Sequence, residues 1–131
     1  KGLLKSAIRC PDPVLFLEHK GLYRQPFSKG PEGGKEDLIP IGKAKVVRKG
    51  SDATIITWGA LVRKSLVAAE TVAKEGYEIE VVDLRTISPL DTKTIVESAK
   101  KTGRVLIAHE DNLFMGFGAE VAAQIAELAF D

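Results

Sequence analysis

From Lys43 onward the chain alternates short apolar runs with amphipathic segments, and this alternation restricts the fold more than any other feature of the sequence. The expected strands are 43–50, 53–59, 77–84 and 105–108, and the expected helices are 60–76, 92–103 and a last one from 118 onward. Strands that alternate with helices need right-handed crossovers and form a mainly parallel sheet. We therefore predict an α/β fold, a three-layer αβα domain with a mainly parallel sheet and helices on both faces.

The first 42 residues have a different pattern. Residues 2–10 place apolar side chains at helical spacing, and the prolines at 11 and 13 end that helix. Residues 14–17, VLFL, are fully apolar, which is typical of a buried strand. The following stretch up to Gly42 holds three prolines and five glycines without any sustained period. Irregular loops of this length are uncommon inside a compact domain, so we expect it to join two domains.

Three polar strand ends are expected at one edge of the sheet, because ligands of open α/β sheets bind beyond the carboxyl ends of the strands. These ends are 57–59 (TWG), 83–86 (DLRT) and 109–112 (HEDN). Asp91 precedes the helix at 92–103 and is its expected N-cap.

His109, Glu110 and Asp111 form the most chemically suggestive group in the chain. A zinc site is disfavoured, because the other histidine, His19, lies in the irregular stretch. A serine hydrolase is disfavoured, because no G-x-S-x-G turn is present. General acid–base catalysis by His109 or Glu110 stays open. The favoured interpretation is a polar corner that binds loop amides and a neighbouring chain.

The remaining residues at this edge have structural interpretations. Gly116 and Gly118 do not complete a G-x-G-x-x-G or Walker motif, and we expect them to let the loop pass close to another backbone. The alternative is that the free N–H groups at the N-terminus of the last helix, near Gly118, bind an anion. Arg85 is expected to pair with the Asp83 carboxylate. Trp58 is expected in the core or in an interface.

Composition excludes several classes of protein. The net charge is +1 with no basic block, which disfavours nucleic-acid binding. The single cysteine, Cys10, cannot form a disulfide framework within one chain and suggests a reducing, intracellular setting. The apolar runs are shorter than the ~20 residues of a transmembrane helix, so no membrane partner is expected.

Four segments in order carry a resemblance to a known family: DPVLFLEHKGLYR (12–24), IPIGKAKVVRKGSDATIITWG (39–59), EVVDLRTISPLD (80–91) and TGRVLIAHEDNLFMGFGAEVAAQIAE (102–127). Together they resemble the β subunit of the thiamine-diphosphate-dependent 2-oxo acid dehydrogenases. LEHKGLYR and the His109-Glu110 pair are closer to the branched-chain (2-oxoisovalerate) enzyme than to the pyruvate enzyme.

The resemblance implies that residues 1–25 are the tail of the pyrimidine-binding domain, 26–42 an interdomain linker and 43–131 a transketolase C-terminal-like domain. It implies a C-terminal fragment that lacks its last segment, from an oxidoreductase of branched-chain amino acid catabolism in a multienzyme complex. The complete enzyme is a heterotetramer of two α and two β subunits. It uses thiamine diphosphate and magnesium to decarboxylate a 2-oxo acid and passes the acyl group to a lipoyl transacylase.

No catalytic, cofactor-binding or metal residue of that family maps onto this chain, so the fragment alone is expected to be inactive and to bind no cofactor. Its expected role is assembly with the α subunit, a second β subunit and the subunit-binding module of the transacylase. The candidate interface residues are His109, Glu110, Asp111, Asn112, Phe114 and Trp58. Residues 112–115 form a candidate apolar patch for a homodimer, or else fold back onto their own domain.

The implied location is the bacterial cytoplasm, or the mitochondrial matrix in a eukaryote. Two alternatives stay open. One is a β-subunit fragment of a pyruvate or acetoin dehydrogenase. The other is a stand-alone α/β domain that binds a small molecule at the three strand ends.

Overall fold

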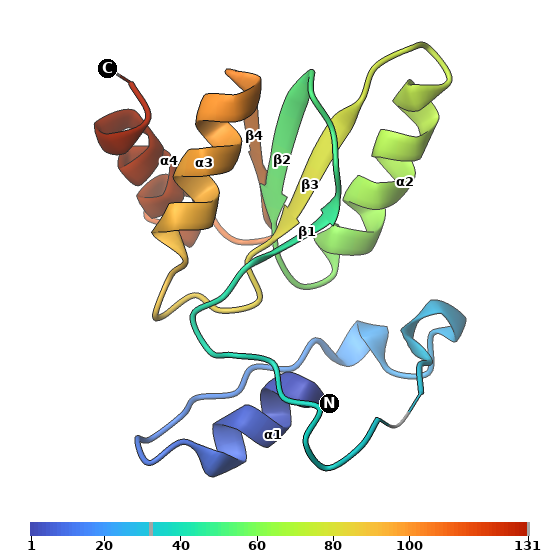
Figure 1. Cartoon of the computed structure of the whole chain (residues 1–131), viewed down its shortest axis with the longest axis vertical. Helices are drawn as coiled ribbons and strands as arrows, with labels where there is room; N and C mark the ends of the chain where they lie inside the picture. Colours follow the sequence, from blue (N-terminus) through green and yellow to red (C-terminus); the bar gives the residue numbers. More distant parts are fainter. Residues whose placement is uncertain (32, 131) are drawn as a thin grey trace.

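The computed structural model describes residues 1–31 and 33–130 (Figure 1). The α-helices are α1 (Gly2–Arg9), α2 (Leu61–Ala73), α3 (Thr92–Thr102) and α4 (Phe117–Leu128). The strands are β1 (Lys45–Arg48), β2 (Ala53–Thr57), β3 (Ile79–Asp83) and β4 (Val105–Ala108). Two short 3₁₀ turns, Lys20–Leu22 and Pro26–Ser28, lie in the irregular stretch. The expected strand–helix alternation after Lys43 is therefore confirmed.

The strands form one mixed sheet in the order β1-β3-β2-β4. β3 and β4 each pair in parallel with β2, and β1 pairs antiparallel with β3. Thr57 at the end of β2 pairs in register with Asp83 on one side and Ala108 on the other. The three polar strand ends thus meet at one edge of the sheet, as the sequence predicts.

Helices cover both faces of the sheet, with α2 on one side and α3 and α4 on the other (Figure 1). Successive side chains of a strand point to opposite faces of the sheet, so each strand contributes side chains to the packing on both faces. Ile56 and Val82 belong to the core that α3 and α4 close, whose buried members also include Leu84, Ile95, Ala99, Val121 and Ile125. The predicted three-layer αβα domain is confirmed.

The segment before the domain lies across the carboxyl edge of the sheet and holds few buried side chains (Figure 1). Within it, α1 docks on its own following loop, where the Ser6 hydroxyl donates to the Ile39 carbonyl at 2.6 Å. α1 itself has no fully buried residue, and Ile8 on its apolar face is 75% exposed. The predicted helix at 2–10 is confirmed, but its apolar face is left largely uncovered.

The prediction of a buried strand at 14–17 is wrong in this structure. These residues form no strand, and Leu15 is 86% exposed. An isolated extended run cannot form a ladder, because its N–H and C=O groups need a neighbouring strand as partner. Among the described residues no strand pairs with this run.

Candidate functional site at the carboxyl edge of the sheet

The imidazole of His109 is a packed ring at the end of β4. It stacks on Trp58, with ring centroids 5.3 Å apart and an interplanar angle of 10°. Trp58 in turn meets Phe117 edge to face at 5.5 Å. The backbone N–H of Asp111 donates to His109 Nδ1 at 3.2 Å, which places the proton of the neutral ring on Nε2.

Two glycines make room for this arrangement. A Cβ on Gly116 would lie 1.9 Å from the carbonyl oxygen of Asn112, so the expected close backbone approach is confirmed there. A Cβ on Gly118 would lie 2.3 Å from His109 Nε2. At Gly118 the neighbour is therefore a side chain, and the prediction of a close backbone is wrong at that position.

The three side chains of the HED motif point to different partners. Glu110 binds His19 Nε2 at 3.2 Å and Lys64 Nζ at 3.4 Å, both outside its own loop. Asp111 accepts the Asn112 N–H at 2.7 Å within the loop. Glu110 and His109 share no hydrogen bond among the contacts of the described residues, so the motif does not form an acid–base pair.

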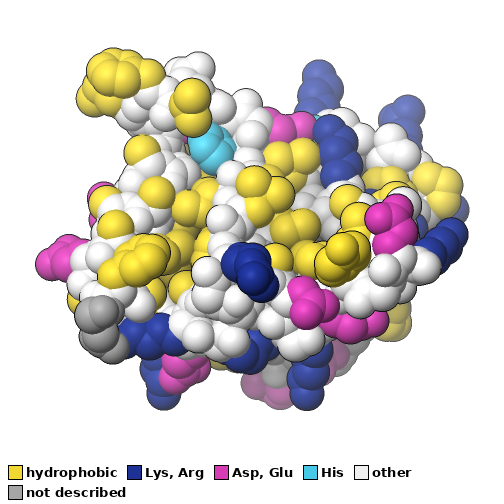
Figure 2. All heavy atoms as spheres, turned by 90° about the horizontal axis from the view of Figure 1, so that it is seen from above, with side chains coloured by type: hydrophobic (Ala, Val, Ile, Leu, Met, Phe, Trp, Pro, Cys, Tyr) yellow, Lys and Arg dark blue, Asp and Glu magenta, His cyan; other side chains and the backbone are white. Residues whose placement is uncertain are grey.

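The loop after the HED motif exposes consecutive apolar side chains. Leu113, Phe114 and Met115 are 92%, 84% and 85% exposed, so they do not fold back onto their own domain. Figure 2 shows that hydrophobic side chains also gather across one face of the molecule, with charged side chains mainly toward its rim. Exposed apolar surface of this kind marks an interaction region or a surface that a neighbouring chain covers.

The end of β3 carries a partly buried carboxylate, that of Asp83. Burial raises the pKa of Asp83, although the Arg85 N–H, which donates to its carboxylate at 3.1 Å, and the nearby cations Arg85 and Lys45 oppose the shift. No ion pair within 4.0 Å joins the Arg85 guanidinium to Asp83 in the described part of the chain, so the predicted Arg–carboxylate pair is wrong there. The hydrogen bond comes instead from the backbone of Arg85, whose φ is 60°. Thr57 Oγ1, beside Asp83 in the sheet, is buried without a hydrogen-bond partner in the described part of the chain.

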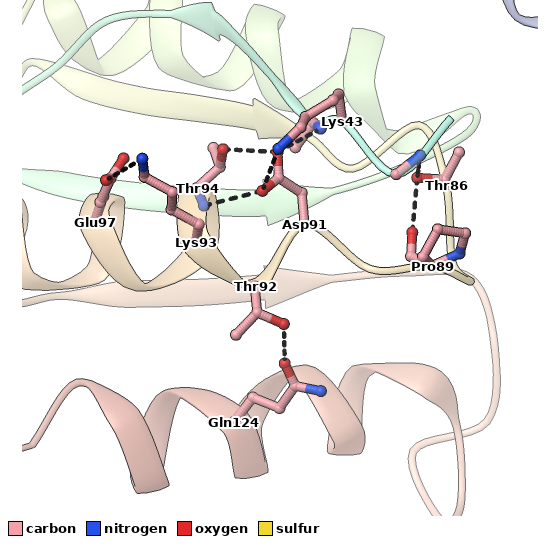
Figure 3. A network of polar contacts seen from close by, with 11 residues as sticks. Lys43, Thr86, Pro89, Asp91, Thr92, Lys93, Thr94, Glu97 and Gln124 are labelled. Atoms are coloured by element: carbon pink, nitrogen blue, oxygen red, sulfur yellow. Dashed lines mark hydrogen bonds and ion pairs between the residues drawn. The ribbon is translucent and has the colours of Figure 1, made fainter. Parts of the chain in front are cut away.

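Asp91 is the centre of a polar network that ties the start of the domain to α3 (Figure 3). Its carboxylate accepts from the Thr94 N–H at 3.3 Å, the Thr94 hydroxyl at 2.9 Å and the Ala44 N–H at 3.1 Å. Burial raises the pKa of Asp91, but these hydrogen bonds and the nearby Lys43 outweigh burial and hold it below 3.8. The predicted N-cap is confirmed, and its second role, binding Ala44, was not foreseen.

Sequence reasoning also missed a cavity of ≈ 490 Å³ between α2 and residues 19–27. Its walls include His19, Arg63, Lys64 and Glu110. The residues come from three separate segments, and Arg63 and Lys64 have the pattern of an ordinary solvated helix face. No local motif signals that they meet.

The described residues offer no set of ligands for a metal and no span for a membrane. Within residues 1–31 and 33–130, no group of three His, Cys, Asp or Glu side chains could hold a metal ion. No helix in those ranges is long and apolar enough to cross a bilayer.

Comparison with known families identifies the domain. Residues 42–131 match the family model described as "Transketolase, C-terminal domain". The "Pyruvate dehydrogenase E1 component subunit beta" of Staphylococcus epidermidis is 50% identical over 129 residues, which is 98% of this chain and 39% of that protein. The Staphylococcus aureus protein of the same name gives the same identity and coverage. The chain thus spans 39% of the length of these relatives.

Two solved structures share the fold. "Split gene transketolase, inactive beta4 tetramer" matches with a TM-score of 0.66 and 33% identity, over 75% of this chain and 33% of that chain. A 2-oxoglutarate:ferredoxin oxidoreductase from Magnetococcus marinus matches with a TM-score of 0.51 and 16% identity, over 63% of this chain and 14% of that chain. The second match concerns the fold alone.

Proposed function

Because the chain belongs to the transketolase C-terminal domain family through residues 42–131, we propose that it is the assembly domain of a 2-oxo acid dehydrogenase β subunit. The observation that carries this proposal is the 50% identity over 129 residues to relatives named as dehydrogenase β subunits. In this role the domain supports the active-site domains and presents a surface to other subunits, and no catalytic residue is assigned to it.

The proposed organisation keeps residues 1–25 as the tail of a pyrimidine-binding domain and 26–42 as a linker. The family model begins at residue 42, whereas the similarity to the β subunits extends over nearly the whole chain, which supports a separate unit upstream. The exposed apolar run at 14–17 and the uncovered face of α1 support it too. Both have the character of core elements whose neighbours belong to other polypeptide.

Thiamine diphosphate and magnesium belong, in this proposal, to the complete enzyme. The described residues do not fit such a site, because they contain neither a cluster of metal ligands nor a glycine-rich diphosphate loop. When bound in the complete enzyme, the cofactor supplies the carbanion chemistry of decarboxylation. No step of that chemistry is assigned to residues of this chain.

The proposed substrate class is the 2-oxo acids, with two members in competition. LEHKGLYR and His109-Glu110 favour 2-oxoisovalerate and the other branched-chain acids. The names of the relatives favour pyruvate instead. Assays of the complete enzyme with pyruvate and with 2-oxoisovalerate separate the two, because the preferred acid gives the larger kcat/KM.

The proposed partners are an α subunit, a second β subunit and the subunit-binding module of a lipoyl transacylase. The HED corner and the loop at 112–115 are the proposed contact surfaces, since they combine exposed charge with exposed apolar side chains. The bacterial relatives support a location in the bacterial cytoplasm.

Calorimetry tests the proposal directly. The 131-residue chain is expected to show no heat of binding with thiamine diphosphate and magnesium, and to release no carbon dioxide from pyruvate or 2-oxoisovalerate. A longer β subunit assembled with its α subunit is expected to do both. Saturable binding of thiamine diphosphate by the chain alone contradicts the assembly role.

A further inference from the structure

The cavity between α2 and residues 19–27 lies where α/β sheets of this kind hold ligands. After β2 the chain continues into α2 on one face of the sheet, and after β4 it continues into α4 on the other face (Figure 1). β2 and β4 are neighbours, so their boundary is the point at which the strand order reverses. Ala60, three residues after β2, and Glu110, two residues after β4, both line the cavity.

The cavity is a groove that is largely open to solvent, and its volume suits a small organic molecule. At ≈ 490 Å³ it falls in the range of about 300–1,000 Å³ that is usual for ligand pockets. One wall is α2 and the opposite wall is the irregular segment around the two 3₁₀ turns. A contact of 3.2 Å between His19 Nε2 and the Glu110 carboxylate joins the two sides.

The charges around the cavity favour an anion. The lining contains the cations Arg63 and Lys64 and one carboxylate, Glu110. Glu110 already pairs with Lys64, whose Nζ lies 3.4 Å from its carboxylate, so these two charges of opposite sign offset each other. Arg63 remains as the uncompensated charge of the site.

The guanidinium of Arg63 is free to bind a ligand. It lies over the ring of Phe27, 5.7 Å from the centroid, which fixes the direction of the side chain. Within residues 1–31 and 33–130 no hydrogen-bond acceptor or carboxylate pairs with it. A guanidinium presents two parallel N–H donors, which match the two oxygens of a carboxylate.

The lining also contains three large apolar side chains, alongside the polar Gln25 and His19. Leu22 and Phe27 come from the irregular segment, and Val67 lies one helical turn beyond Arg63 on α2. Phe27 and Val67 are about half exposed, so the molecule leaves them in contact with solvent. An apolar ligand body placed there removes this surface from water.

We propose that this cavity binds a small organic carboxylate with an apolar body, held by Arg63 at the charged end and by Leu22, Phe27 and Val67 along the body. In the proposed organisation the site lies between the tail and linker, residues 19–27, and helix α2 of the C-terminal domain, so its place in the complete protein rests on that proposal. It adds a ligand-binding activity to a domain to which no catalytic residue is assigned.

Hexanoate is a suitable probe, and its uncharged analogue hexanamide is the matched control. Titration of the 131-residue chain, followed by ¹H–¹⁵N NMR, is expected to give saturable shifts for hexanoate at residues 19–27 and 60–67. Hexanamide is expected to bind about tenfold more weakly, because it lacks the charge-assisted hydrogen bonds to Arg63. Inorganic phosphate, which has charge but no apolar body, is also expected to bind more weakly than hexanoate.

Two substitutions locate the two halves of the site. Arg63→Gln is expected to weaken hexanoate binding about tenfold, whereas Arg104→Gln, the same change on an exposed arginine that precedes β4 at the opposite edge, leaves binding unchanged. Val67→Glu places a carboxylate in the cavity and is expected to abolish binding. Val67 is half exposed, so the variant keeps its fold, which circular dichroism checks.

Three results overturn the proposal. The first is the absence of saturable binding of hexanoate up to its solubility limit. The second is equal binding of hexanoate and hexanamide, or of hexanoate and phosphate. The third is an equal loss of affinity in Arg63→Gln and Arg104→Gln, which indicates general charge attraction instead of a site.

Discussion

The ring of His109 stacks on the ring of Trp58 at a centroid distance of 5.3 Å, and the Gly118 backbone lies against the Nε2 side of the imidazole. The stack joins the end of β4 to the end of β2 and to the start of α4. His109 therefore serves mainly to pack the carboxyl edge of the sheet. The stack also positions Glu110 and Asp111, which follow it in the sequence.

Gly118→Ala tests the packing role of His109. The added methyl group would lie 2.3 Å from Nε2, so either the imidazole or α4 must move. We expect a loss of about 1–3 kcal/mol in the free energy of unfolding. Denaturant unfolding measures the loss, and a change in Trp58 fluorescence reports the displaced ring. Gly30→Ala is the matched control, since nothing lies within 4 Å of its added Cβ and its stability should not fall.

Asp91→Asn tests the network at the start of α3. The substitution replaces the carboxylate that accepts hydrogen bonds from Thr94 and Ala44 by a neutral amide. We expect the free energy of unfolding at pH 7 to fall by about 2 kcal/mol. The folded-state pKa of Asp91 lies below 3.8, so its contribution is complete above 3.8 and is lost as the pH falls through the folded-state pKa. Denaturant unfolding between pH 2 and 7, compared at about one-unit steps, measures both effects.

The asparagine variant should therefore differ from the parent at neutral pH and approach it in acid. Asp12→Asn serves as the control, because Asp12 is exposed and its side chain forms no hydrogen bond or ion pair in the described part of the chain. If the free energy of unfolding of the Asp91 variant runs parallel to that of the parent over the whole pH range, the ionised Asp91 carboxylate is not the source of the stabilisation.

Glu110→Lys tests the proposed docking of the transacylase module. In the complete enzyme we expect about tenfold weaker docking, measured by titration, because charges at the rim of an interface steer association. Thiamine diphosphate binding should remain unchanged, since no residue of this chain is assigned to it. Glu75→Lys, an equal charge reversal just after α2 at the opposite edge of the sheet, should leave docking intact. Docking unaltered by Glu110→Lys removes the basis for this partner surface.

The exposed loop provides a test of self-association. We expect the chain to form a two-fold dimer, which the triple substitution of Leu113, Phe114 and Met115 by serine converts to monomer in sedimentation velocity. A control triple substitution by serine of Val14, Leu15 and Leu17 removes exposed apolar surface from another part of the chain. Loss of the dimer in the control instead assigns the contact to residues 14–17.

Local sequence pattern was sufficient for most of the elements after Lys43. Each of these elements is encoded by residues that are close together in the sequence, and each forms where predicted. Examples are the helical period of 60–76, the cap at Asp91 and the apolar run at 105–108. Pairing direction has no such local signal. β1 runs antiparallel to β3, but nothing in its four residues distinguishes an antiparallel strand from a parallel one, so the sequence did not predict this direction.

The errors concern relations between distant segments. The run at 14–17 has the composition of a strand, but a strand exists only where another strand offers its backbone. The expected binding of loop amides is found at His109 and Asp111. The partners of Glu110, which are His19 and Lys64, come from distant segments and were not foreseen. The cavity beside α2 needs residues from three segments to meet, and a single sequence does not encode such a meeting in any short pattern.

The bond between Asp91 and the Ala44 N–H joins the point where the chain enters the sheet to the first turn of α3. The residue that leads into β1 is therefore held to the helical layer as well as to the sheet. Whatever is attached upstream of residue 43 is thereby linked to α3 by a hydrogen bond as well as by the backbone, and the His19–Glu110 contact adds a second link at the edge of the sheet.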